Sequence, residues 1–110
     1  FLGYLLADHD RDLPEAQNLI QLALEKDPDN GAFLDSLGWV FFRLGRLSDA
    51  RRELEKAVGL TQGDPVVLDH LGDVYRDLKM PEQARDQYQK SLAKDESNQS
   101  RLRGKLQSLR

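Results

Sequence analysis

The feature that most constrains this chain is a repeat of small and apolar residues every 34 positions. Alanine occupies positions 16, 50 and 84, and the residues four positions after each alanine are all large and apolar or aromatic. Four further pairs keep the same spacing: Leu34/Leu68, Leu37/Leu71, Gly38/Gly72 and Phe41/Tyr75. So many pairs of similar residues do not share one spacing by chance. The chain is therefore an array of repeated structural units.

Each unit has the pattern of two amphipathic helices. The apolar residues that recur at helical spacing in the second unit are Leu34, Leu37, Phe41 and Leu44, then Leu47, Ala50, Leu54, Ala57 and Val58. Asp64-Pro65 is a cap followed by proline at the first helical position, and Gly45 suits the left-handed residue after a helix. Asp12 with Glu15 resembles a capping box. The sequence therefore predicts an all-α fold of antiparallel helix pairs.

Gly38 lies inside one of these predicted helices, where glycine costs roughly 1 kcal/mol relative to alanine. We expect it at the closest approach of the two helices, facing Ala50 and Ala57, because only small side chains fit there. The packing of the surrounding large side chains then offsets the loss of helix propensity.

The order of these residues resembles the signature of the tetratricopeptide repeat (TPR) family. The matching residues are Leu34-x-x-Leu37-Gly38-x-x-Phe41 with Ala50, Leu54 and Ala57, and Leu68-x-x-Leu71-Gly72-x-x-Tyr75 with Ala84 and Tyr88. The resemblance implies a right-handed superhelix, an α-solenoid whose first helices line a concave groove. It divides the chain into units at 1–30, with a shortened first helix, at 31–64 and at 65–98, followed by a capping helix at 99–110.

Two stretches, LGYLLAD at 2–8 and FLDSLGWV at 33–40, are similar to the C-terminal repeats of bacterial cell-envelope TPR proteins, many of them lipoproteins. This finer resemblance favours the envelope or periplasm over the cytoplasm. The chain starts inside the pattern and without methionine, which suggests an excised fragment. The apolar side of helix 14–26 then lacks its cover, so we expect weak self-association through this end.

The resemblance also identifies the positions that face the groove. In this chain they are Tyr4, Asp8, Asp35, Ser36, Trp39, Phe42, Arg43, Val66, Asp69, His70, Asp73, Arg76 and Asp77. In TPR proteins these positions hold an extended peptide or a partner's helix, which implies a non-catalytic scaffold for protein–protein interaction. Two alternatives stay open: a structural spacer with no ligand of its own, and an accessory module that recruits substrates to an enzyme.

Two interpretations apply to each chemical group on this surface. One interpretation is an exposed aromatic surface that anchors a ligand, formed by Trp39 and Phe42 with Tyr4 of the preceding unit. The other is that Trp39 packs between neighbouring first helices.

An acidic strip runs across the units: Asp35 and Asp69 are equivalent, and Asp73 and Asp77 follow Asp69 on the same helix face. It attracts a basic or mixed-charge ligand, or else it is an ordinary solvated face in which Asp35 and Arg43 are paired with neighbours. Carboxylate-clamp TPR domains carry lysine, asparagine and arginine in these columns, and this chain does not, so a carboxylate-clamp ligand is not expected.

The C-terminal stretch is basic and carries one apolar stripe, which predicts a capping helix over 97–109. The stripe consists of Leu102, Leu106 and Leu109, and the cations are Arg101, Arg103, Lys105 and Arg110. These cations form a patch for nucleic acid or an anionic membrane, or else they complement the helix dipole and the acidic body. The net charge of −3 favours the structural interpretation and gives no support for general nucleic-acid binding.

The sequence contains none of the motifs of phosphate-binding loops, dinucleotide-binding folds, serine hydrolases or zinc proteases, and it has no cysteine. The residues most similar to a metal-ligand set are Asp69, His70 and Asp73. His70 follows Asp69 directly, so on a helix it points about 100° away from the two carboxylates. We therefore predict neither a cofactor nor a metal site.

Overall fold

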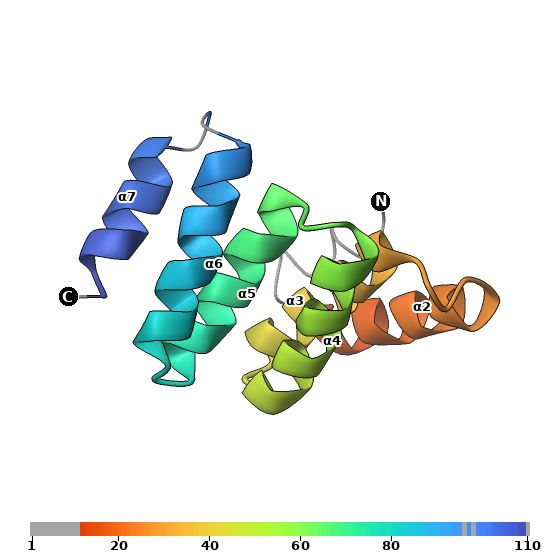
Figure 1. Ribbon diagram of the computed structural model, residues 1–110. Helices are drawn as coiled ribbons and strands as arrows, with labels where there is room; N and C mark the ends of the chain where they lie inside the picture. Colours follow the sequence, from red (N-terminus) through yellow and green to blue (C-terminus); the bar gives the residue numbers. More distant parts are fainter. Residues whose placement is uncertain (1–11, 96, 98, 110) are drawn as a thin grey trace.

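The computed structural model describes residues 12–95, 97 and 99–109, and this part of the chain is a row of helices (Figure 1). They are α2 (Leu13–Lys26), α3 (Gly31–Arg43), α4 (Leu47–Leu60), α5 (Pro65–Asp77), α6 (Pro81–Lys94) and α7 (Gln99–Gln107). The most extensive packing lies within the pairs α3/α4 and α5/α6. The fold is thus the all-α helical repeat that the sequence predicts.

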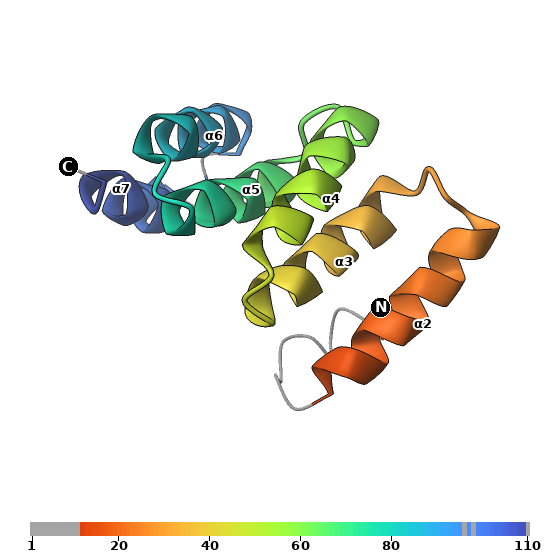
Figure 2. The same cartoon turned by 90° about the horizontal axis from the view of Figure 1, so that it is seen from below.

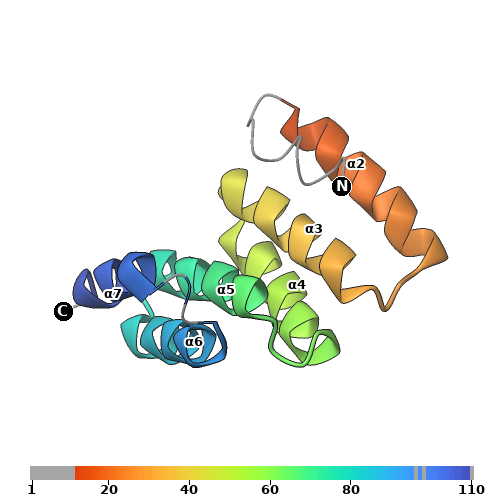
Figure 3. The ribbon, with the colours of Figure 1, turned by 90° about the horizontal axis from the view of Figure 1, so that it is seen from above.

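The helix pairs stack in chain order. α3 packs against both α2 and α4, and α5 packs against both α4 and α6, so each first helix contacts the second helix of the preceding unit. Figures 2 and 3 show α3, α5 and α7 following one another along the array. We call the surface made by these three helices the first-helix face, because it carries the positions predicted to line the groove.

Side-chain caps mark the starts of α3 and α5: the side chain of Asn30 accepts from the backbone N–H of Phe33 at 3.0 Å, and Asp64 acts in the same way. Asp64 Oδ1 accepts hydrogen bonds from the backbone N–H groups of Val66 (2.9 Å) and Val67 (3.4 Å), and Pro65 begins α5. Gly45 has the expected left-handed conformation, with φ of +77°. The capping box at Asp12 is wrong: its φ and ψ are −111° and 29°, not extended, and its side chain caps no helix amide.

Gly38 lies where two backbones approach closely, as predicted. A Cβ atom at this position would lie 2.6 Å from Leu54 Cγ and 3.4 Å from the carbonyl oxygen of Ala50. The prediction named Ala57 as the second neighbour, but the side chain of Leu54 occupies that space. Gly72 repeats the contact in the next unit, where the ring of the fully buried Tyr88 lies against it.

Most residues of the predicted stripes are buried or half-buried, and three valines outside those stripes, Val40, Val67 and Val74, are buried as well. Leu34, Leu37 and Phe41 are buried, whereas Leu44 is 37% exposed because α3 ends at Arg43 and Leu44 is its C-cap. At the other end of the array Leu102 of the terminal helix α7, which packs against α6, is fully buried. This helix is shorter than predicted, since α7 covers only part of 97–109.

Among the described residues, no helix is both long enough and apolar enough to cross a lipid bilayer. Tyr4 and Asp8 lie outside the described residues, as does the start of the predicted first unit.

Candidate interaction surface

A buried polar contact joins α3 to α5. His70 Nδ1 lies 2.8 Å from Asp35 Oδ1, and both residues are less than 10% exposed. The two residues lie 35 positions apart, so the contact links successive units. Asp35 and His70 were both predicted to face a ligand, and their side chains meet each other. Ser36, a neighbour of Asp35, is also buried and donates its hydroxyl to the backbone oxygen of Ala32 at 3.1 Å.

Trp39 lies beside this contact and stacks on two rings. Its ring centroid is 4.3 Å from that of His70 and 4.9 Å from that of Phe42. Trp39 and Phe42 are both half-buried. The indole Nε1 is buried and has no hydrogen-bond partner among the described residues. Trp39 therefore packs between units, in line with the second interpretation, and the Trp39–Phe42 stack still keeps part of its surface exposed.

The acidic strip on α5 is covered by α7. Lys105 Nζ lies 2.8 Å from Asp69 Oδ1 and 2.9 Å from Asp73 Oδ1, and Arg101 also pairs with Asp69. Both carboxylates are buried, with 4% and 6% of their residue surfaces exposed. Asp73 accepts a further hydrogen bond from the hydroxyl of Tyr88 at 2.6 Å. Asp69 and Asp73 are therefore neither solvated nor open to a basic ligand, whereas Asp77 of the predicted strip is exposed.

The electrostatics of this cluster agree with its geometry. Burial acts to raise the pKa of Asp69, but hydrogen bonds from Lys105 and Arg101 outweigh it and hold that pKa below its ordinary value of 3.8. Burial and the hydrogen bond to Asp73 raise the pKa of the Tyr88 hydroxyl well above its ordinary range. Asp69 thus stays ionised, and Tyr88 stays protonated and can donate its hydrogen bond.

A signal for this cluster was present in the sequence. Arg101 and Lys105 are four residues apart on α7, and Asp69 and Asp73 are four residues apart on α5. Residues at this spacing share a helix face, so two adjacent helices can match two cations with two anions. The structural role predicted for these cations agrees with the contacts, but their partners Asp69 and Asp73 were not predicted.

The remaining predicted positions lie at the ends of α3 and α5. Arg43 is exposed at the end of α3, and Val66 is 47% exposed at the start of α5. Arg76 donates to Asp77 at 3.0 Å and to Asp73 at 3.3 Å. These residues, with the Trp39–Phe42 stack, are the predicted positions that keep accessible surface.

Asp69, His70 and Asp73 do not converge on one point. His70 contacts Asp35 of the preceding unit, whereas the two aspartates face the cations of α7. Within the described residues, no group of three or more histidine, cysteine, aspartate or glutamate side chains is arranged to hold a metal ion.

Stacked helix pairs joined by contacts between successive first helices define a helical repeat scaffold. The chain belongs to the tetratricopeptide repeat family, whose sequence models match residues 2–65 and 67–98. A TPR repeat-containing protein of Pseudomonas aeruginosa is 45% identical over 72 residues. That match covers 66% of this chain but only 12% of the relative. The envelope location stays a prediction.

Solved structures show the same fold. The first TPR domain of Spaghetti, bound to an HSP90 peptide, matches with a TM-score of 0.84 at 18% identity and covers 97% of this chain and 89% of its own. PcrH, in complex with the chaperone-binding region of PopD, matches with a TM-score of 0.82 at 16% identity, over 97% of this chain and 87% of its own. At these identities the likeness concerns the fold.

Proposed function

We propose that this chain is a protein-interaction scaffold that binds a peptide or a partner's helix along the first-helix face. Membership of the TPR family supports this proposal, as do related structures that hold a peptide or a partner segment. The observation that carries it is the half-exposed stack of Trp39 and Phe42 on α3. Aromatic residues that combine a packed base with an open edge are common anchors of binding energy.

The accessible positions favour one ligand chemistry. An apolar side chain of the ligand would rest on Trp39 and Phe42, with Val66 as a second apolar contact further along the face. Charged groups of the ligand would meet Arg43 and Asp77, which are both exposed. Asp69 and Asp73 contribute little, because α7 already supplies their cations. The expected ligand is therefore anchored by an apolar group, with its charges at the periphery.

Selection of a phage-displayed peptide library on the purified chain tests this proposal. Selected peptides are titrated calorimetrically against the wild type, Phe42→Ala and the control Leu60→Ala, which removes an exposed apolar side chain from α4. Truncation of an anchor costs about 2 kcal/mol, so we expect Phe42→Ala to weaken binding about thirtyfold. We expect Leu60→Ala to leave affinity unchanged. Circular dichroism checks that both variants fold.

Equal binding by the wild type and Phe42→Ala would contradict the proposal. Failure to select any peptide would favour the alternative of a spacer with no ligand of its own, because the Trp39 and His70 contacts between units would then explain these residues by packing alone.

The exposed leucines of α2 support weak self-association as a second property. The expectation that the whole apolar side of this helix lacks its cover is wrong, because Ala16 and Ile20 are buried; Leu19 and Leu22 are 36% and 57% exposed. Adjacent exposed leucines favour contact with another apolar surface. We expect sedimentation velocity to show a concentration-dependent increase in mean mass that Leu22→Glu abolishes. A monomer at every concentration would contradict this.

A further inference from the structure

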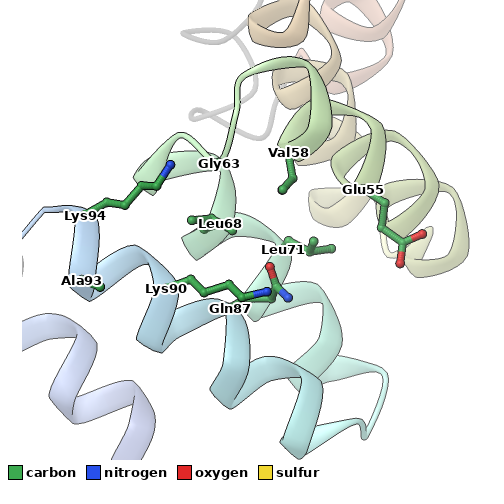
Figure 4. A pocket seen from close by; sticks show the side chains of 9 residues that line it. All are labelled: Glu55, Val58, Gly63, Leu68, Leu71, Gln87, Lys90, Ala93 and Lys94. Atoms are coloured by element: carbon green, nitrogen blue, oxygen red, sulfur yellow. The ribbon is translucent and has the colours of Figure 1, made fainter.

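A cavity of about 520 Å³ lies between α4, α5 and α6 (Figure 4), and neither Trp39 nor Phe42 lines it. Its lining comes from α4, from the turn after it, and from α5 and α6. The lining residues are Glu55, Val58, Gly63, Leu68, Leu71, Gln87, Lys90, Ala93 and Lys94. Figure 4 shows apolar side chains of α4 and α5 at its base and the lysines along the α6 side.

The base of this cavity is apolar and belongs to the core. Leu68 and Leu71 are 2% and 3% exposed, and Val58 is half-buried beside them. A cavity of this size admits an aliphatic or aromatic side chain of a partner. Burial of such a side chain gains about 1.5–3 kcal/mol, a modest energy that needs a polar contact for specificity.

The cations at the edge supply that polar contact. Lys94 Nζ donates to the backbone oxygen of Gln62 at 2.5 Å, and no carboxylate of the described residues forms an ion pair with it. Lys90 shares its charge with Asp86 at 3.0 Å. A carbonyl does not neutralise an ammonium group, so the edge next to Lys94 keeps a net positive charge.

The carboxylate on the opposite wall is already satisfied. Glu55 Oε2 accepts a hydrogen bond from the Tyr75 hydroxyl at 2.5 Å and from Arg51 Nε at 3.0 Å. Burial raises the pKa of Tyr75 to about 12, with the hydrogen bond to Glu55 acting in the same direction, so this donor stays protonated. Glu55 therefore does not cancel the positive charge of the α6 edge.

The preceding unit provides an internal comparison. A second cavity of about 460 Å³ contains Leu34, Lys56 and Gly59, which lie 34 positions before Leu68, Lys90 and Ala93. In this copy Leu60 stands at the position of Lys94 and Asp29 at the position of Gly63. The repeat thus builds the same cavity twice, and only the second copy carries a pair of lysines.

We propose that the cavity between α4 and α6 binds an acidic, apolar peptide segment of a protein partner. An apolar side chain enters between Val58 and Leu68, and an adjacent carboxylate of the peptide pairs with Lys94. This site lies on different helices from the Trp39–Phe42 stack, so the two sites can be occupied at the same time. The partner is recognised by charge complementarity together with the apolar base.

Two capped peptides of equal length and apolar content, ELFEEL and KLFKKL, serve as probes in an NMR titration of the isotope-labelled chain. We expect ELFEEL to shift the amide signals of Val58, Gly63 and Ala93, and KLFKKL to leave them unchanged. An exposed charge pair contributes up to about 1 kcal/mol, so Lys94→Glu weakens ELFEEL binding about fivefold. Arg85→Glu, an identical charge change elsewhere on α6, leaves its affinity unchanged.

Absence of shifts with ELFEEL, equal binding of both probes, or equal losses in Lys94→Glu and Arg85→Glu would each overturn the proposal. The spectra of the free variants show whether each still folds. Phe42→Ala binds ELFEEL like the wild type, so failure here is distinguishable from failure on the first-helix face.

Discussion

The surfaces of α3 and α5 occupy equivalent places in successive units, yet their chemistry has opposite consequences. On α3 the central position is Trp39, whose ring stacks on Phe42 and keeps part of its surface exposed. On α5 the position 34 residues later is Asp73, which is buried against Lys105. A repeat can thus keep an accessible aromatic surface on one unit and use the same surface of the next unit to hold the terminal helix.

This difference has a physical cause. A carboxylate exposes little apolar area and attracts a cation strongly once water is excluded, so it suits a permanent contact with a basic helix. An indole exposes a large apolar area whose burial by a ligand is favourable and reversible. The α5 carboxylates are therefore occupied by α7, whereas the Trp39–Phe42 stack on α3 keeps the accessible surface on which the proposed recognition depends.

The largest expected effect comes from reversing the charge of Lys105. Lys105→Glu places a carboxylate beside the buried Asp69 and Asp73, and we expect the free energy of unfolding to fall by about 3 kcal/mol. Urea denaturation followed by circular dichroism measures this change. Arg103→Glu, on the exposed side of α7, is the matched control and should change stability by less than about 0.5 kcal/mol. Equal effects would show that α7 does not depend on the α5 carboxylates.

Removal of the imidazole between the two surfaces has the next largest effect. His70→Ala leaves the buried Asp35 without its 2.8 Å contact and Trp39 without one stacked ring, so we expect a loss of about 2 kcal/mol. Trp39 is the single tryptophan of the chain, so its fluorescence reports this site alone. We expect its emission to shift to the red in His70→Ala and to stay unchanged in Lys105→Glu. A shift in both variants would show that the surfaces are coupled.

The dependence of stability on acidic pH also distinguishes the α5 surface from the α3 surface. The folded-state pKa of Asp69 is below its ordinary value of 3.8, so its stabilising contribution is complete above that value and is lost as pH falls through the folded-state pKa. We expect the melting temperature to fall over this acid range and the fall to be smaller in Asp69→Asn. Identical acid profiles of the wild type and Asp69→Asn would contradict the proposed ion pairing.

Truncation of Phe42 should have the smallest effect on stability. Its ring is half-exposed and one stacked aromatic pair contributes about 0.5–1.5 kcal/mol, so we expect Phe42→Ala to cost about 1 kcal/mol. Thermal melts measure this cost. A loss as large as that of Lys105→Glu would mean that the aromatic stack is part of the core rather than an accessible surface.

Most of the fold can be predicted from the sequence because equivalent residues recur every 34 positions. The close approach at Gly38, the cap at Asp64 and the buried stripes depend on neighbours within one unit, and periodicity shows those neighbours directly. Leu44 fits the periodic stripe but lies one residue beyond the end of its helix. Asp12 has the right residue type for a cap, but its backbone is not extended.

The candidate site was harder to predict because its chemistry depends on contacts between units. The positions of Asp69 and His70 on the first-helix face follow from the family pattern, but their partners Lys105 and Asp35 lie on other helices. The packing of the half-buried Trp39 ring depends on the ring of His70. His70 lies on another helix, so the pattern of α3 alone does not predict this packing.

A double-mutant cycle between Asp69 and Lys105 tests most directly the claim that α7 occupies the α5 surface. Asp69→Asn, Lys105→Met and the double variant are compared with the wild type by urea denaturation. Direct contact predicts a coupling free energy of about 1–2 kcal/mol. Additive losses, within about 0.3 kcal/mol, would contradict the claim and return the acidic strip to the set of surfaces open to a ligand.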